Sequence, residues 1–258
     1  KQVLRQPGRS SPHDDHFHLR VYCALHERLE GCVNSGPMHK WVDDLEDEIA
    51  GFAKQYIKEI DDKSTRVAVE AIRRLGKMRA RSATKRLLKA LADKRLDVRL
   101  AAVTALEDLH ALDSNLSVLV AAAEAAKAGM FRLRLLKILA RKAHPAAKKL
   151  FRAVAVAADA RADSRAVAAE GSAAACDRDA VAGLIECVAS QESVVRDAAT
   201  RALSRLTGQT MTSQDAWNAW WKDNAKKTRA EWLADTFEDT LGMKLTPKTC
   251  RKFIGKLV

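Results

Sequence analysis

A mainly α-helical fold of stacked helical hairpins is predicted for this 258-residue chain by three features of its sequence. The composition favours helices, because Ala, Leu, Lys and Arg are abundant and only 5% of the residues are aromatic. Helix breakers are scarce, with five prolines and eleven glycines, too few for an all-β protein. The third feature is an internal repeat of about 33 residues.

The charge divides the chain near residue 62. The net charge is −4 over residues 1–62 and +16 over residues 63–258, which together give the +12 of the whole chain. We expect four regions: a short N-terminal region at 1–37, a connecting acidic helix at 38–62, helical repeats at 63–208, and Trp-rich capping helices with a basic tail at 209–258.

The N-terminal region carries three histidines within six residues, His13, His16 and His18, followed by alternating apolar and polar residues. In a strand, side chains two residues apart share a face, so His16 and His18 would lie opposite Phe17 and Leu19. Two histidines backed by an apolar layer can present neutral nitrogens to a metal ion. The alternative is an unrelated surface loop that happens to carry histidines.

The segment from His13 to Cys23 resembles the last motif of the penicillin-insensitive murein endopeptidases, which are zinc peptidases of bacterial cell-wall cross-links. Their pattern reads His-Asp-Asn/Asp-His-Phe-His-aliphatic-Arg, with a Cys five residues after the last His. The resemblance implies that His18 is a zinc ligand, that His16 supports catalysis beside the metal, and that His13 lines the same cleft. It also implies a disulfide between Cys23 and Cys32, and a short α+β remnant of a metallopeptidase domain before the helices.

The family takes its other two zinc ligands from an upstream Ser-x-His-x-x-Gly-x-x-x-Asp motif that this sequence lacks. A catalytic zinc needs about three protein ligands, and the chain begins at Lys1 with only His18 as a good candidate. The resemblance therefore implies the C-terminal part of an endopeptidase, inactive as given, with zinc bound only when the missing part is present. Its parent would act on peptidoglycan in the periplasm or outside the cell, although no export signal is visible.

Residues 38–62 are predicted to form one helix, because apolar residues recur there at near-helical steps. These apolar residues are Trp41, Leu45, Ile49, Phe52, Tyr56 and Ile60. Five acidic residues between positions 43 and 48 suit the first turns of a helix, where the macrodipole favours negative charge. We interpret them as a solvated face and not as a metal cluster.

The repeat is clearest in segments 96–106 and 192–203, which share the pattern Val-Arg-x-x-Ala-x-x-Ala-Leu. The arginine of this pattern recurs at steps of 33, 33, 33 and 31 residues, at Arg66, Arg99, Arg132, Arg165 and Arg196. The pattern resembles HEAT repeats, which implies an α-solenoid of about five helical hairpins, each sharing its core with its neighbours.

Each repeated element has an expected role. The arginines are predicted to lie along one edge and bond to a neighbouring repeat or an acidic partner; the alternative is an array that faces a ligand phosphate or carboxylate. Helix N-caps are expected at Ser64, Asp97, Asp163 and Ser193, and C-terminal caps at Gly76 and Gly208. The second helices should bury apolar faces that include Leu150, Val154 and Val156.

Near the C-terminus, Trp217, Trp220 and Trp221 fall on one helical face. We expect them to cap the open end of the stack, with a carbohydrate- or base-stacking platform as the alternative. Cys176 and Cys187 are interpreted as two buried free thiols in preference to a disulfide.

Three functions follow from these observations. The first is the endopeptidase fragment, whose repeats would bind a protein partner or an anionic envelope surface. The second is a protein–protein interaction scaffold without enzymatic activity. The third is nucleic-acid binding, ranked last because Lys and Arg are dispersed and do not alternate with aromatic residues. No transmembrane segment is expected, since no apolar run approaches eighteen residues.

Overall fold

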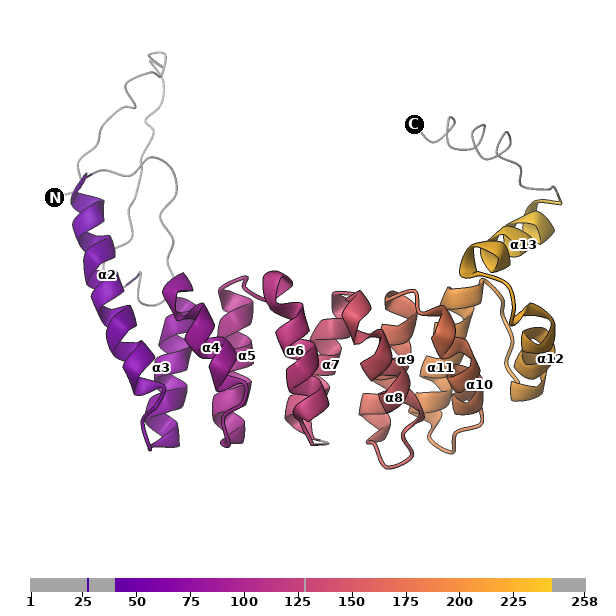
Figure 1. Cartoon of the computed structure of the whole chain (residues 1–258), viewed down its shortest axis with the longest axis horizontal. Coiled ribbons are helices and arrows are strands. Elements are labelled where there is room, and N and C mark those ends of the chain that lie inside the picture. Colours follow the sequence, from indigo (N-terminus) through magenta and orange to yellow (C-terminus); the bar gives the residue numbers. More distant parts are fainter. Residues whose placement is uncertain (1–26, 28–39, 128, 243–258) are drawn as a thin grey trace, which may run out of the picture. The chain divides into compact units, whose positions relative to one another are not determined.

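The computed structural model of the chain describes residue 27 and residues 40–127 and 129–242 (Figure 1). These residues form twelve α-helices and four short 3₁₀ helices, and they contain no β-strand. The α-helices are α2 (Lys40–Glu59), α3 (Thr65–Lys77), α4 (Thr84–Ala90), α5 (Leu96–Asp108), α6 (Leu116–Ala125), α7 (Met130–Arg141), α8 (Lys148–Val156), α9 (Ala162–Ala174), α10 (Val181–Val188), α11 (Ser193–Thr207), α12 (Gln214–Asn224) and α13 (Arg229–Leu241). The prediction of a mainly α, HEAT-like helical-repeat fold is confirmed for this part of the chain.

The chain divides into two compact units, Lys1–Leu112 and Asp113–Val258, called here the first and second units. In the first unit, α3 packs against both α2 and α5, and α4 packs against α5. Ile72, Leu75 and Leu106 are fully buried in this packing. The connecting helix α2 contributes Ile49 and is followed by Ile60, both buried and both among the apolar residues predicted for this segment.

In the second unit, the longer helices form a row in which α9 packs between α7 and α11. The shorter helices α6, α8 and α10 pack against α7, α9 and α11 respectively, and they lie in front of them in Figure 1. α8 also contacts α10. Each hairpin therefore buries one face against its neighbours, as a helical repeat requires, and leaves the outer side of its short helix toward solvent.

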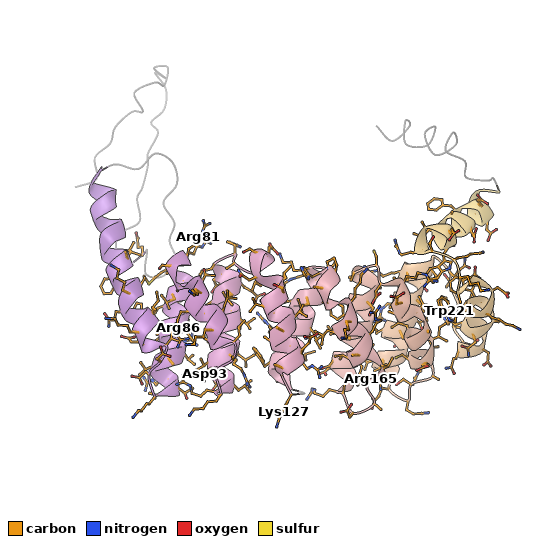
Figure 2. All side chains as sticks on the ribbon, in the orientation of Figure 1. Arg81, Arg86, Asp93, Lys127, Arg165 and Trp221 are labelled. Atoms are coloured by element: carbon orange, nitrogen blue, oxygen red, sulfur yellow. The ribbon has the colours of Figure 1, made fainter. Side chains whose placement is uncertain are left out.

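The loops of the first unit are held together by arginines (Figure 2). Arg86 of α4 forms an ion pair with Asp61, which follows α2. Arg95 Nη1 donates to the Asp62 carbonyl at 2.7 Å, and its Nη2 bonds to the Asp93 carboxylate at 2.9 Å. The hydrogen bonds from Arg95 lower the pKa of Asp93 to about 2. The loop between α4 and α5 is thus fastened to the loop between α2 and α3.

A left-handed turn that the repeat pattern did not predict follows four helices. Arg79, His110, Ala143 and Cys176 have φ between 50° and 52°, although none is glycine. At each turn the next residue's N–H bonds back to a carbonyl five positions earlier, as from Asp177 to Ser172 at 2.9 Å. This hydrogen bond is typical of a helix C-terminal motif in which glycine is usual. The repeats therefore share a backbone conformation at this point and not a residue type.

The predicted caps are only partly right. Gly208 ends α11 with φ of 79°, as expected of a C-terminal glycine. Gly76 instead lies inside α3, where a Cβ would approach the Ala105 Cα to 3.0 Å, so its small size permits α3 and α5 to pack closely. Asp97 and Asp163 lie in the first turns of α5 and α9, whose N-caps are Arg95 and Arg161.

The remaining predicted N-caps differ in outcome. Ser64 does precede α3, but its side chain makes no capping hydrogen bond. Ser193 is the first residue of α11, and Glu192 is its N-cap. Side-chain capping is present at α12 and α13, where Ser213 accepts from the Ala216 N–H and Thr228 forms a capping box with Glu231.

Tryptophans of the two C-terminal helices pack into the core of the second unit. Trp217 and Trp232 are buried together with residues of α10 and α11, and Trp220 and Trp221 are half-buried against them. The Trp220 and Trp232 rings meet edge to face with centroids 5.4 Å apart. Arg178 donates to the Lys227 carbonyl at 2.8 Å and stacks 5.5 Å from the Trp232 ring, so α12 and α13 are fastened to the preceding repeat.

Candidate binding surfaces

Two of the repeated arginines bond to backbone carbonyls. Arg165 Nε donates to the Ala155 carbonyl in the last turn of α8 at 3.0 Å, and Arg196 Nη1 donates to the Ser190 and Gln191 carbonyls at 2.8 Å. Backbone carbonyls at helix ends have no partner within their own helix. Arg165 thus acts as a donor to the C-terminal end of α8, whereas Arg196 bonds to the loop between α10 and α11, and neither bond is to an acidic partner.

The other three repeated arginines have different surroundings. Arg99 of α5 and Arg132 of α7 are half-buried, and the Arg132 Nε is enclosed without a hydrogen-bond partner among the described residues. Arg66 of α3 is exposed and has no ion pair with any residue that the structure describes. The five arginines therefore do not share a single type of partner.

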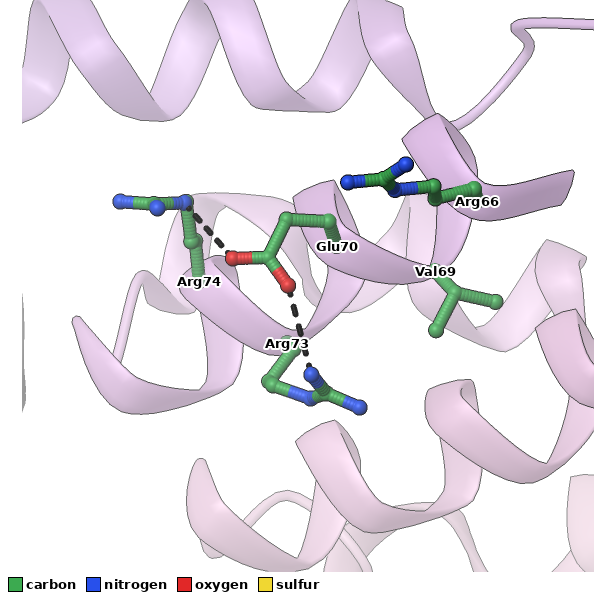
Figure 3. Close-up of a pocket in the computed structure, with 5 residues that line it drawn as sticks. All are labelled: Arg66, Val69, Glu70, Arg73 and Arg74. Atoms are coloured by element: carbon green, nitrogen blue, oxygen red, sulfur yellow. Dashed lines mark hydrogen bonds and ion pairs between the residues drawn. The ribbon is translucent and has the colours of Figure 1, made fainter. Parts of the chain in front are cut away.

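Arg66 lines a surface hollow of about 450 Å³ on α3 (Figure 3). Within it, Glu70 accepts from Arg74 Nε at 3.0 Å and from Arg73 Nη1 at 3.3 Å. The Arg74 guanidinium also lies 5.8 Å from the centre of the Tyr56 ring, and Tyr56 is the main cause that raises the pKa of Arg74. Three arginines surround one glutamate, so the hollow is positively charged, but all of these side chains are at least partly solvated.

A second pocket, a partly open hollow in the second unit, lies between α8 and α10 and has a volume of about 300 Å³. Its walls are mostly small apolar side chains, with one hydroxyl and one ion pair. The lining residues are Arg152, Ala153, Ala155, Val156, Ser172, Asp179, Ala180, Gly183 and Leu184. Val156 was predicted to be buried in the face of a second helix, but it is 44% exposed. A Cβ on Gly183 would approach Val156 Cγ1 to 2.8 Å, so the absence of a side chain at 183 permits Val156 to pack directly against α10.

The polar groups around this α8–α10 pocket are unevenly satisfied. Ser172 is fully buried, and its Oγ has no hydrogen-bond partner within the described part of the chain. Arg152 Nη1 donates to Asp177 Oδ1 at 3.1 Å and to Asp179 Oδ2 at 3.0 Å. Burial raises the pKa of Asp177, although Arg152 partly opposes the shift. An enclosed hydroxyl without a partner is unusual in a folded protein.

The pocket residues could not be found from the repeat pattern. Gly183 is an isolated glycine within a helix, and Ser172 is a serine among alanines; these are the signals that the sequence offers. Neither signal distinguishes a ligand pocket from close helix packing. Gly171, one position before Ser172, illustrates the second case, because a Cβ there would lie 2.7 Å from two ring carbons of Phe151.

The two cysteines within the described residues are both free thiols. Cys187 is buried, as predicted; its Sγ donates to the Ala155 carbonyl at 3.3 Å, and burial raises its pKa. Cys176 is exposed, so the prediction of two buried thiols is wrong for this residue. It lies at the left-handed turn after α9, which places it outside the core.

The described residues contain no group of three or more His, Cys, Asp and Glu side chains that could hold a metal ion. The predicted zinc ligand His18, the predicted catalytic residues His13 and His16, and the predicted disulfide between Cys23 and Cys32 all lie outside the described residues. None of the described helices combines the length and the apolar character needed to cross a bilayer.

Comparison with known proteins gives structural similarities only. No family model matches the chain, and no curated protein matches its sequence. One similar solved structure is the complex of CpcE and CpcF of phycocyanin lyase from Nostoc sp. PCC7120, with 20% identity, coverage of 79% of this chain and 78% of that chain, and a TM-score of 0.47. Another is human deoxyhypusine hydroxylase in complex with glycerol, with 17% identity, coverage of 62% of this chain and 75% of that chain, and a TM-score of 0.33. At these values neither similarity transfers an activity or a ligand to this chain.

These findings correct the endopeptidase interpretation of the N-terminal motif. No family model matches the chain, that of the endopeptidases included, and the solved structures that it resembles are a phycocyanin lyase complex and deoxyhypusine hydroxylase. The described residues contain no strand, and they give no indication of the α+β remnant, which was predicted for residues 1–37, almost all of them outside the described part of the chain. A motif of eleven residues was too short to establish a family. Peptidoglycan cleavage thereby loses its support, whereas the zinc-site roles of His13, His16 and His18 stay predictions, because these residues lie outside the described part of the chain.

Proposed function

We propose that this protein is a protein-interaction scaffold, in which helical repeats present a binding face to a partner protein. The observation that carries the proposal is the outer side of the short helices in the second unit. Val118 of α6 and Val156 of α8 are 39% and 44% exposed. Ala121 of α6, Ala153 of α8 and Ala182 of α10 are exposed as well.

These side chains are small and apolar, and they lie on the helices that the core packing leaves outermost (Figure 1). Burial of apolar surface drives most protein association, at roughly 25 cal/mol per Å² removed from water. Contiguous exposed apolar surface on a soluble protein commonly marks an interaction site. Small side chains also allow a partner's backbone or ring to approach closely, which suits a scaffold whose repeats form a continuous surface.

The test is affinity capture with the full chain and two matched arginine variants. Ala153→Arg places a charged side chain on the α8–α10 pocket, and Ala146→Arg places the same charge on an exposed position outside the pocket. We expect partner proteins captured by the wild type to be lost with A153R and retained with A146R. Circular dichroism and thermal unfolding of both variants establish that each is folded. Identical sets of proteins captured by both variants would refute the proposed binding face.

A further inference from the structure

The hollow on α3 that contains Arg66, Arg73 and Arg74 has the features of a site for a compact dianion (Figure 3). We propose that it binds a phosphate monoester on a phosphorylated side chain of a partner protein. That the carrier is a protein rests on the proposed scaffold function, whereas the preference for phosphate rests on the hollow alone. Its basis is the charge of the lining, the unused donors of the arginines and their accessibility.

The charge of the lining selects a dianion. Three arginines carry +3 and Glu70 carries −1, so the lining has a net charge of +2. A phosphate monoester carries about −1.5 to −2 at neutral pH and therefore balances this charge. A partner carboxylate balances half of it, and it would only repeat the bonds that Glu70 already makes to Arg73 and Arg74.

The arginines retain hydrogen-bond donors for a ligand. A guanidinium presents five N–H donors in a planar fork that matches the oxygens of a phosphate. Glu70 accepts one bond from Arg74 at 3.0 Å and one from Arg73 at 3.3 Å. Arg66 makes no ion pair with any residue that the structure describes, and Figure 3 shows its guanidinium directed toward Glu70. A phosphate in the hollow can therefore accept from Arg66 while Glu70 keeps its two bonds.

These donors are accessible from solvent. The side chains of Arg73 and Arg74 are 62% and 38% exposed, and Arg66 is exposed as well. The volume of about 450 Å³ lies within the range of small-molecule sites. Two contacts restrain Arg74 before a ligand arrives, its bond to Glu70 and its stacking 5.8 Å from the centre of the Tyr56 ring. This restraint lowers the conformational entropy lost on binding.

An adjoining hollow shares Arg66, Glu70 and Arg74 with the first and adds a carboxylate from α2. This carboxylate belongs to Glu59, which accepts from Gln55 Nε2 at 2.8 Å. With both hollows counted, three arginines and two glutamates leave a net charge of +1. The full +2 is confined to the first hollow, which Glu59 does not line, so the phosphate is placed there.

The experiment is an NMR titration of the isotope-labelled full chain with N-acetyl-phosphoserine N-methylamide and with the corresponding capped glutamate. We expect the phosphoserine to bind about fivefold more tightly, the gain from one additional exposed ion pair at the upper end of its usual range. Arg66→Gln should remove this preference. Arg81→Gln, which changes an exposed arginine of the same unit outside the hollow, should leave it unchanged. Circular dichroism establishes that both variants are folded.

The pH provides a second readout, because the monoester gains a proton with a pKa of about 6. The preference for phosphoserine should therefore shrink between pH 7.5 and pH 5, while the capped glutamate stays ionised and binds as before. The arginines keep their charge over this range, and no histidine is among the described residues that line either hollow. Glu70→Gln should strengthen the binding of both anions, because it raises the net charge of the lining.

The source of the phosphate is tested by affinity capture. Proteins lost with R66Q and retained with R81Q should also be lost when the lysate is treated with phosphatase before capture. Equal affinity for the two capped amino acids, equal losses in R66Q and R81Q, or a preference independent of pH would overturn the phosphate site. Tighter binding of single-stranded DNA than of phosphoserine, abolished in R66Q, would overturn it in favour of a nucleic-acid contact. If phosphoserine binds as expected but A153R and A146R capture the same proteins, the proposed binding face fails and the phosphate site stands.

Discussion

Replacing Gly171 by alanine should destabilise the second unit, although alanine is the better helix former. Gly171 lies inside α9, where alanine would ordinarily stabilise a helix by about 1 kcal/mol. A Cβ at this position, however, would lie 2.7 Å from Cε1 and Cζ of Phe151, against a usual carbon–carbon separation of about 3.5–4.0 Å. Phe151 is fully buried in α8 and cannot move into solvent.

The magnitude follows from these opposing effects. Overpacking a core typically costs about 1–3 kcal/mol, so after the helix-propensity gain we expect a net loss of about 1–2 kcal/mol in the free energy of unfolding. Urea unfolding followed by tryptophan fluorescence measures this loss in the second unit, because four of the five tryptophans lie in α12 and α13. Phe151→Leu removes the clashing ring, and in the double variant Gly171→Ala should no longer be destabilising.

A matched control comes from Gly51, an exposed glycine of α2 where an added Cβ would have no atom within 4 Å. Gly51→Ala should stabilise its own helix by up to about 1 kcal/mol, as judged by circular dichroism of the first unit's unfolding. If G171A were stabilising to the same extent, or if Phe151→Leu did not restore it, the reasoning from the α8–α9 contact would be refuted.

Three further results are expected. Ala143→Gly should raise the free energy of unfolding by about 0.5–1 kcal/mol, because φ of 50° strains alanine but not glycine; a loss of stability in urea unfolding would contradict this. Asp93→Asn should lower the free energy of unfolding by about 1–2 kcal/mol at pH 7, and this loss should shrink as the pH falls from about 4 to about 2. The reason is that Arg95 lowers the pKa of Asp93 in the folded state, so the stabilisation is lost when the carboxylate is protonated. A loss that does not depend on pH in urea titrations would oppose that account. Iodoacetamide should alkylate Cys176 faster than Cys187 in the native protein, as followed by peptide mass spectrometry, because Cys187 is buried with a raised pKa; equal rates would show that the second unit opens readily.

The repeat was predictable because the residue types recur at regular intervals along the sequence. Helices bury residues at fixed intervals, so the pattern Val-Arg-x-x-Ala-x-x-Ala-Leu located α5 and α11 within a few residues. Helix ends were less predictable. Asp97 has the chemistry of an N-cap but lies inside α5, since the loop before it is organised by the bonds between Arg95 and Asp93. Such bonds depend on loop geometry, which side-chain periodicity does not encode.

The α8–α10 pocket could not be predicted for a related reason. Val156 has the residue type and the spacing of a core position, yet it is 44% exposed at the last position of α8. Ser172 has no sequence signal that separates a satisfied serine from an unsatisfied one. Both properties arise from how two helices distant in sequence pack together. In contrast, the N-terminal histidine motif offered a strong chemical pattern that misled, because short motifs recur without their structural context.

The packing of the second unit has a consequence for how it comes apart. α9 packs against α7 and α11, so forces between the two ends of this row pass through α9. Structures held by nearest-neighbour contacts behave as linear chains of coupled segments, in which one weak link uncouples the segments on either side. A destabilising substitution in α9 should therefore convert a single unfolding transition into two. The end that carries the tryptophans of α12 and α13 should stay folded after the other end has unfolded. Hydrogen exchange would then show a boundary of protection at α9 instead of a uniform decline.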